Sequence, residues 1–176
     1  MEAGEQRMNY FQLLEVPQGF FPDKALVRKK YYELSRKFHP DFFAQQGEAA
    51  REQAEERLKE VHAAYSVLSD VGKTMAYLLE LETGMVSDEK YALSPDFLME
   101  MMELNEAMQE ADTAEGKAEI TTKILEKKME LYEDIKPVLE AYQPGLVSPE
   151  AMLPIKDYFF RLKYINRLLD EGADKF

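Results

Sequence analysis

Apolar residues recur at intervals of three and four along almost every segment of this 176-residue chain. Residues at that spacing share one face of an α-helix, whereas a surface strand would require strict alternation. Glycine and proline, the residues that interrupt helices, are sparse, with eight of each. The pattern therefore predicts an all-α protein.

Three helices are expected in the first half of the chain. The first covers residues 10–14, and the second runs from residue 24 to His39, because Pro40 disfavours helical geometry in the residue before it. A polar stretch leads to the third helix. The second and third helices carry matching apolar stripes, Val27, Tyr31, Leu34 and Phe38 on one and Leu58, Val61, Tyr65 and Leu68 on the other. Two antiparallel helices facing each other would bury both stripes.

A further apolar segment covers residues 75–81. The stretch 85–93 after it is interpreted as a linker, and a domain boundary is expected near residue 85. Three more helices are expected after it, of which the first opens at Ser94, a good cap residue that is followed by proline. The other two cover residues 115–141 and 154–170. Pro137 lies inside the first of these two and should kink it or separate its last turn.

Composition excludes several classes of function. The formal net charge of −12 and the pI near 4.7 argue against nucleic acid as a partner, since phosphate binding needs a basic field. Without cysteine there is no disulfide, thiolate nucleophile or thiolate metal site, and no cofactor is expected. No apolar run approaches the roughly 20 residues of a membrane span, and residues 1–7 lack the apolar core of a signal peptide. We expect a cytoplasmic protein that binds no membrane.

The second predicted helix has a basic outer face in this acidic chain. With its apolar stripe turned inward, the side chains that face solvent are Arg28, Lys29, Tyr32, Arg36 and Lys37. Such a local inversion of charge predicts an acidic partner surface. The alternative is a solvated helix face whose basic residues lie near the C-terminal end because they interact favourably with the helix dipole.

His39, Pro40 and Asp41 follow directly at the turn into the third helix. Proline fixes the loop, so the imidazole and the carboxylate are held where a partner can pair with them. A histidine near a carboxylate can also act as a general acid or base. However, positions on either side of a proline cannot easily orient one another, and no nucleophile is recognisable nearby, so we expect no enzymatic activity. His62 is interpreted as a structural or surface residue rather than a metal ligand.

The run Val27-x-x-x-Tyr31-x-x-Leu34-x-x-x-Phe38-His39-Pro40-Asp41 resembles the J-domain family in its apolar spacing and in the position of its tripeptide. The resemblance implies a J-domain over residues 8–80. It also implies that the basic helix and the tripeptide dock on the nucleotide-binding domain and linker of a DnaK-type chaperone. Phe42 departs from the family, in which a lysine commonly follows the tripeptide.

The helix from Ser94 is apolar on two faces. Phe97, Met101, Leu104 and Met108 form an inward stripe, while Leu98, Met99 and Met102 fall on the other side among acidic residues. The last helix repeats this pattern, with an inward stripe that leaves Phe160 and Tyr164 outward. A second apolar face indicates either a protein partner or a third layer of the fold that covers it.

Four segments narrow the resemblance to the HscB family of iron-sulfur co-chaperones: Asn9-Tyr10-Phe11, Ala76-Tyr77-Leu78-Leu79, Phe97-Leu98-Met99-Glu100 and Arg161-Leu162-Lys163-Tyr164-Ile165. That family implies a C-terminal three-helix bundle, here residues 85–176, that binds an IscU-like iron-sulfur scaffold protein. The positions that match its scaffold-binding face are Leu98, Met99, Met102, Glu103, Glu106 and Tyr164. The resemblance also implies a DnaK/HscA-type chaperone whose ATPase the protein stimulates and to which it delivers the scaffold for cluster maturation and transfer.

Two other functions remain open from the sequence. A J-domain protein could serve a different client through the same bundle, or the chain could be a structural helical adaptor with an inert tripeptide. Weak self-association is also left open.

Overall fold

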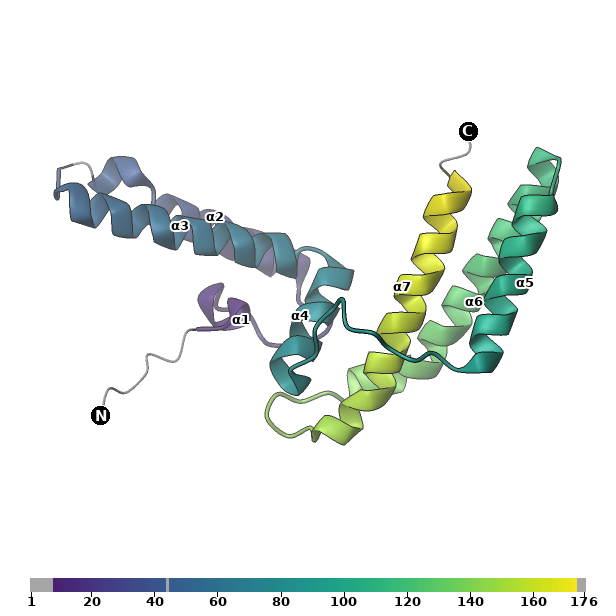
Figure 1. The fold of residues 1–176 in the computed structure, drawn as a ribbon. Coiled ribbons are helices and arrows are strands. Elements are labelled where there is room, and N and C mark those ends of the chain that lie inside the picture. The colour runs from purple at the N-terminus through teal and green to yellow at the C-terminus, as the bar shows by residue number, and fades with distance from the viewer. Residues whose placement is uncertain (1–7, 44, 174–176) are drawn as a thin grey trace. The chain divides into compact units, whose positions relative to one another are not determined.

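A computed structural model describes residues 8–43 and 45–173. Its regular secondary structure within those ranges is entirely helical (Figure 1). The elements in chain order are α1 (Tyr10–Leu13), α2 (Lys24–Lys37), η1 (Pro40–Phe43), α3 (Glu48–Leu68), α4 (Val71–Thr83), α5 (Pro95–Glu110), α6 (Ala114–Glu140), η2 (Pro149–Met152) and α7 (Leu153–Ala173). The predicted all-α class is confirmed. Residues 1–7, for which the sequence predicts no signal-peptide core, lie outside the described residues.

The chain divides into two compact units, one ending at Leu78 and the other beginning at Leu79. We call them the N-terminal and C-terminal units and describe each by itself. The domain ranges 8–80 and 85–176 remain predictions.

The N-terminal unit is built on the antiparallel pair α2 and α3, and the short α1 packs against α3 (Figure 1). The two predicted stripes face each other: Val27 and Val61 are fully buried, and the rings of Tyr31 and Tyr65 stack at 4.1 Å. The helical hairpin expected from the stripes is therefore confirmed.

The end of α2 explains the position of the tripeptide. The helix stops at Lys37, and the N–H of the cap residue Phe38 still bonds to helix carbonyls. Pro40 then opens the 3₁₀ turn η1, where its fixed φ and missing N–H are tolerated. The tripeptide therefore lies directly after α2, with η1 beginning three residues after the last residue of the helix.

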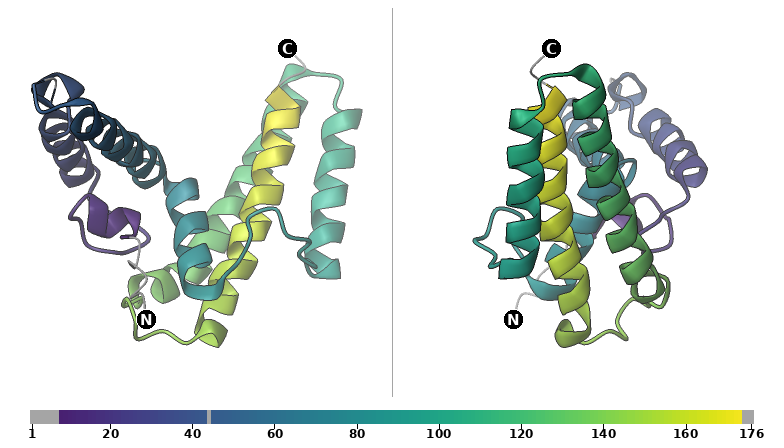
Figure 2. Two further views of the ribbon diagram at one scale, coloured as in Figure 1. Left: turned by 60° about the vertical axis from the view of Figure 1, so that its left-hand side comes forward. Right: turned by 90° about the vertical axis from the view of Figure 1, so that its right-hand side faces the viewer.

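The C-terminal unit is a bundle of α5, α6 and α7 (Figure 2). The start of α5 is as predicted, because the Ser94 hydroxyl caps the Phe97 N–H and Pro95 occupies the first helical position. The buried core of the bundle consists of Phe97, Met101, Ile124, Ile165 and Leu168, and the partly buried side chains that pack on it include Leu104, Met108 and Tyr164. The predicted inward stripe of α5 is confirmed.

Pro137 does not separate the last turn of α6, contrary to one of the two expectations for it. The helix continues to Glu140, and the Ala141 N–H bonds to the Pro137 carbonyl at 3.1 Å. Pro137 lacks the N–H that would bond to the Glu133 carbonyl, so the helix ladder loses one bond there.

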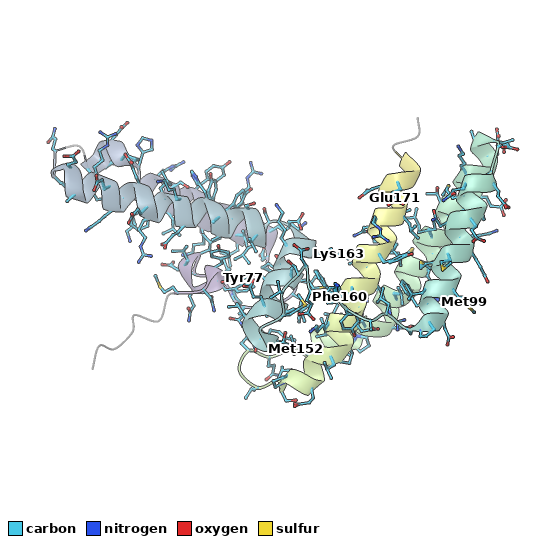
Figure 3. All side chains as sticks on the ribbon, in the orientation of Figure 1. Tyr77, Met99, Met152, Phe160, Lys163 and Glu171 are labelled. Carbon is cyan, nitrogen blue, oxygen red and sulfur yellow. The ribbon has the colours of Figure 1, made fainter. Side chains whose placement is uncertain are left out.

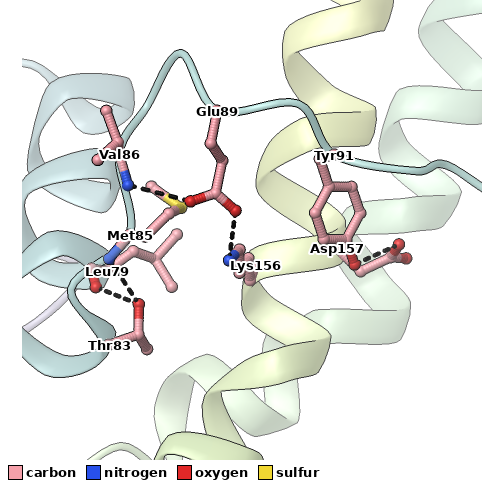
Figure 4. A network of polar contacts seen from close by, with 8 residues as sticks. All are labelled: Leu79, Thr83, Met85, Val86, Glu89, Tyr91, Lys156 and Asp157. Carbon is pink, nitrogen blue, oxygen red and sulfur yellow. Dashed lines mark hydrogen bonds and ion pairs between the residues drawn. The ribbon is translucent and has the colours of Figure 1, made fainter.

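The connection between α4 and α5, residues 84–93, contains no helix and lies against α7; we call it the strap (Figure 4). Met85 is buried at 2% exposure. The Glu89 carboxylate accepts a bond from the Val86 N–H at 3.2 Å and pairs with Lys156 Nζ of α7 at 2.5 Å. These contacts keep the predicted linker attached to the bundle.

Tyr91 makes the central contact of the strap. Its ring stacks on Phe160 of α7 with centroids 4.5 Å apart and planes 6° from parallel, and its hydroxyl donates to Asp157 Oδ1 at 3.1 Å. Burial, reinforced by the Asp157 carboxylate, raises the pKa of Tyr91. Further along α7, Lys163 Nζ bonds to Asp88 at 2.9 Å. The expectation that Phe160 points outward is wrong, because the strap covers it and leaves it 7% exposed.

Candidate functional site

The basic face of α2 is open to solvent. Arg28, Lys29 and Tyr32 are all exposed, and together with Lys24 and Ala25 they line a surface hollow of about 480 Å³. The Arg28 guanidinium lies 5.8 Å from the centre of the Tyr32 ring, within range of a cation–π contact. Arg36 and Lys37 continue the exposed basic side chains into the last turn. The predicted chaperone-binding residues of α2 are therefore all accessible to solvent.

Lys30 is the basic residue of α2 that belongs to the fold. Its ammonium group pairs with Glu15 at 2.5 Å and with Glu33 at 3.8 Å, and its side chain is only 24% exposed. The hydrogen bond with Glu15 raises the pKa of Lys30 and lowers that of the carboxyl. Glu33 also lies 4.0 Å from Lys29, so one acid partly offsets the charge of this face.

The tripeptide lies exposed at the end of this face. The His39 and Asp41 side chains are 52% and 89% exposed, and Pro40 is partly buried between them. The Asp41 N–H donates to His39 Nδ1 at 3.3 Å, and the carboxylate Oδ2 lies 3.6 Å from the same nitrogen. The turn η1 thus brings the Asp41 backbone N–H to the ring, while the Asp41 carboxylate stays beyond hydrogen-bond distance of it.

This geometry determines what the tripeptide offers to a partner. An imidazole whose Nδ1 accepts a backbone N–H carries its proton on Nε2 when neutral. His39 therefore presents a donor to solvent, and Asp41 presents acceptor oxygens beside it. Such a pair is suited to binding complementary polar groups.

A second exposed surface lies on α5. Met99 and Met102 are 61% and 55% exposed, and Glu103 and Glu106 are exposed beside them, whereas Leu98 is partly buried. Figure 3 marks Met99 on α5. Large apolar side chains within an acidic surface suit a partner that carries both apolar and basic groups.

The contacts of α5 with its neighbours identify the flank of the helix on which Leu98 lies. Glu100 pairs with Lys127 of α6 at 3.0 Å, which identifies the flank of α5 that faces α6. Leu98 lies about 160° away around the helix, at 100° per residue, and so on the flank toward α7. From α7, the Tyr164 ring meets Phe97 edge-on at 6.0 Å. By this helical-wheel argument, Leu98 lies at the edge of the bundle where α5 meets α7, the helix from which Tyr164 packs on the core.

The α7 residue Arg161 supports this edge and was not identified from the sequence as a site residue. Its guanidinium lies 5.2 Å from the centre of the Phe97 ring, and Nε lies 2.6 Å from Asp157 Oδ2. Asp157 is also the acceptor for Tyr91 of the strap. The spacing of Asp157 and Arg161 on one face of α7 was visible in the sequence, but the partners from the strap and from α5 were not.

Within residues 8–43 and 45–173, no group of three or more His, Cys, Asp or Glu side chains is arranged to hold a metal ion. Every helix in the described part of the chain falls short of the length or the apolar character that a membrane crossing requires.

Two family models match the chain, the DnaJ domain over residues 9–77 and the HSCB C-terminal oligomerisation domain over residues 93–171. The Co-chaperone protein HscB homolog of Vibrio atlanticus is 32% identical over 165 residues, which cover 93% of this chain and 94% of that protein. The chain belongs to the HscB family of co-chaperones. Its N-terminal part is accordingly a J-domain, as the tripeptide and the apolar spacing indicated.

Other HscB proteins show the same likeness. The Iron-sulfur cluster co-chaperone protein HscB of Homo sapiens is 30% identical over 93% of this chain and 69% of its own length. Among solved structures, the chaperone HscB from Vibrio cholerae matches with a TM-score of 0.71 and 29% identity, covering 95% of this chain and 96% of that one. The human HscB crystal structure matches with a TM-score of 0.79 and 26% identity over 98% and 84% of the two chains. The similarity to HscB therefore extends to the fold of both units.

Proposed function

We propose that this co-chaperone stimulates the ATPase of a DnaK/HscA-type chaperone through α2 and the tripeptide. The observation that carries the proposal is the exposure of His39 and Asp41, which present a donor and an acceptor at the end of a basic helix face. The surrounding charge steers an acidic surface toward them, and removing one partner of a polar pair that is buried on docking weakens an interface strongly. The protein itself contacts no nucleotide and performs no catalysis in this proposal.

The C-terminal unit binds an IscU-like iron-sulfur scaffold protein in the same proposal. Support comes from Leu98 and Tyr164 at the edge where α5 meets α7, from the exposed Met102 one turn after Leu98 and from the role that the human relative's name states. The scaffold should carry an apolar patch flanked by basic groups, since Met99 and the exposed glutamates surround this edge.

Having both binding surfaces on one chain gives the co-chaperone its mechanism. Once the bundle holds the scaffold, docking of the J-domain raises the effective concentration of that client at the chaperone's substrate site. Stimulated ATP hydrolysis then tightens the hold of the chaperone on the scaffold and promotes cluster transfer. The domain ranges 8–80 and 85–176 and the cytoplasmic location expected from the sequence belong to this proposal.

The chaperone half is tested by steady-state ATPase assays of a purified HscA-type or DnaK chaperone with increasing amounts of this protein. His39→Gln should abolish stimulation without loss of helicity, because the flexible amide does not hold a donor in the fixed position that the ring has when its Nδ1 accepts the Asp41 N–H. Stimulation that survives this substitution would refute the mechanism and favour an inert tripeptide.

The scaffold half is tested by titration calorimetry against a purified IscU-like scaffold, with and without its cluster. The Leu98→Ala/Met102→Ala/Tyr164→Ala variant should lose binding yet still stimulate the chaperone in the absence of scaffold. A scaffold that fails to bind the unaltered protein in either state would leave a J-domain co-chaperone with another client.

A further inference from the structure

Phe42, the residue after the tripeptide, has an exposed side chain that the fold does not use. It is 68% exposed, and no other large apolar side chain described in the N-terminal unit is as accessible. The adjacent Phe43 is partly buried, so η1 directs one phenyl ring toward the unit and the other toward solvent. An apolar ring left in water at a docking surface favours a partner that covers it.

The backbone of η1 holds this ring in a defined place. The Phe42 N–H bonds to the His39 carbonyl at 3.0 Å, and the Phe42 carbonyl accepts from Gln46 Nε2 at 3.5 Å. The ring centre lies 6.1 Å from that of the His39 imidazole, with the planes 74° apart. Phe42 is therefore positioned by the same turn that presents the tripeptide.

We propose that Phe42 inserts into an apolar depression of the chaperone, directly beside the groups that receive His39 and Asp41. The proposal rests on the proposed function. The partner is the chaperone because Phe42 adjoins the proposed docking surface. A protein surface that covers the exposed imidazole must also approach a ring whose centre is 6.1 Å away. The chaperone surface for this protein is thus acidic opposite α2 and apolar opposite Phe42.

Charge and apolar contact should contribute differently to binding. The basic face acts over distance and depends on salt, whereas a buried ring acts only after docking and depends little on salt. Because His39 and Asp41 remain unchanged in a Phe42 variant, the ring should affect how tightly the chaperone is held rather than the fully stimulated rate.

The test is an ATPase titration of a purified HscA-type chaperone, and of a DnaK chaperone in parallel, with the full-length protein. Phe42→Ala should raise the concentration for half-maximal stimulation about tenfold with each chaperone that the unaltered protein stimulates, given the transfer free energy of a phenyl side chain. Phe42→Leu should recover most of the loss, and Phe42→Lys should not. The maximal rate should stay the same, and added salt should weaken the unaltered and Phe42→Ala proteins by the same factor.

Leu146→Ala is the matched control, because Leu146 is a similarly exposed apolar side chain, 77% accessible, in the C-terminal unit. It should leave the titration unchanged. If His39→Gln abolishes stimulation while Phe42→Ala behaves as the unaltered protein with both chaperones, the inference about Phe42 is wrong and the proposed function stands. If the unaltered protein stimulates neither chaperone, both fail. A lower sedimentation coefficient of Phe42→Ala than of the unaltered protein alone would assign the ring to a second copy and overturn the proposal.

Discussion

Removing the Tyr91 side chain should detach the strap from α7 while the bundle stays folded. Tyr91→Phe deletes only the hydroxyl that donates to Asp157, and Tyr91→Ala also deletes the ring that stacks on Phe160. The ion pair of Glu89 with Lys156 is partly buried, with side chains 30% and 19% exposed, and both variants retain it.

The structure gives a magnitude for each substitution. A hydrogen bond to a charged acceptor is worth about 1.5–3 kcal/mol, and the partial exposure of this one places Tyr91→Phe near the lower end. Loss of the stacked pair adds about 0.5–1.5 kcal/mol, and the lost burial of the ring adds more. Since each 1.4 kcal/mol is a factor of about ten in an equilibrium constant, opening of the strap should become about tenfold more frequent in Tyr91→Phe and at least about a hundredfold more frequent in Tyr91→Ala.

Amide hydrogen exchange of the full-length protein measures this opening at Val86 and Glu89, whose N–H groups are hydrogen-bonded within the strap. Amides of α3 in the N-terminal unit provide the internal reference. Tyr65→Phe, a hydroxyl deletion in that unit, should leave the strap unchanged. Unaltered exchange at both amides in Tyr91→Ala would refute the view that Tyr91 is the main attachment of the strap.

Two further predictions concern the C-terminal unit. The hydrogen bond with Lys156 lowers the pKa of Glu89, so its contribution to stability is present above the ordinary carboxyl value of 4.5 and is lost as the pH falls through the lowered value. The difference in melting temperature between the unaltered protein and Glu89→Gln should therefore close in acid, and a gap that persists there would contradict the assignment. Met101 is fully buried, so Met101→Ala should lower the free energy of unfolding by about 2–5 kcal/mol in urea titrations followed by circular dichroism. Met102→Ala, at an exposed position of the same helix, should change it by less than about 0.5 kcal/mol.

Local rules account for the parts of the fold that the sequence predicted. Helical periodicity identified the stripes that meet at Tyr31 and Tyr65, because both stripes belong to long, regular helices. Ser94 marked the start of α5, because capping depends on neighbouring residues alone. The end of the preceding helix before Pro40 was predicted in the same way, because proline disfavours helical geometry in the residue before it.

The features that the sequence did not predict depend on contacts between distant segments. Phe160 reads as outward on a helical wheel, which describes α7 alone and contains no information about an irregular strap that covers one side of it. The contact of His39 with Asp41 arises from the 3₁₀ geometry after Pro40, which the adjacency of the residues did not reveal. The contact of the Arg161 guanidinium with the Phe97 ring likewise joins two different helices, α7 and α5.

The distribution of methionines across the bundle has a consequence for oxidative chemistry. Met99 and Met102 lie open to solvent on the outer side of α5, while Met101 and Met152 are fully enclosed. Peroxide converts accessible thioethers to polar sulfoxides and reaches enclosed ones only through unfolding. Mild oxidation should therefore alter the surface proposed to hold the scaffold while sparing the core, and a methionine sulfoxide reductase would restore it. Under oxidising conditions, the protein would then bind the scaffold proposed as its client less tightly.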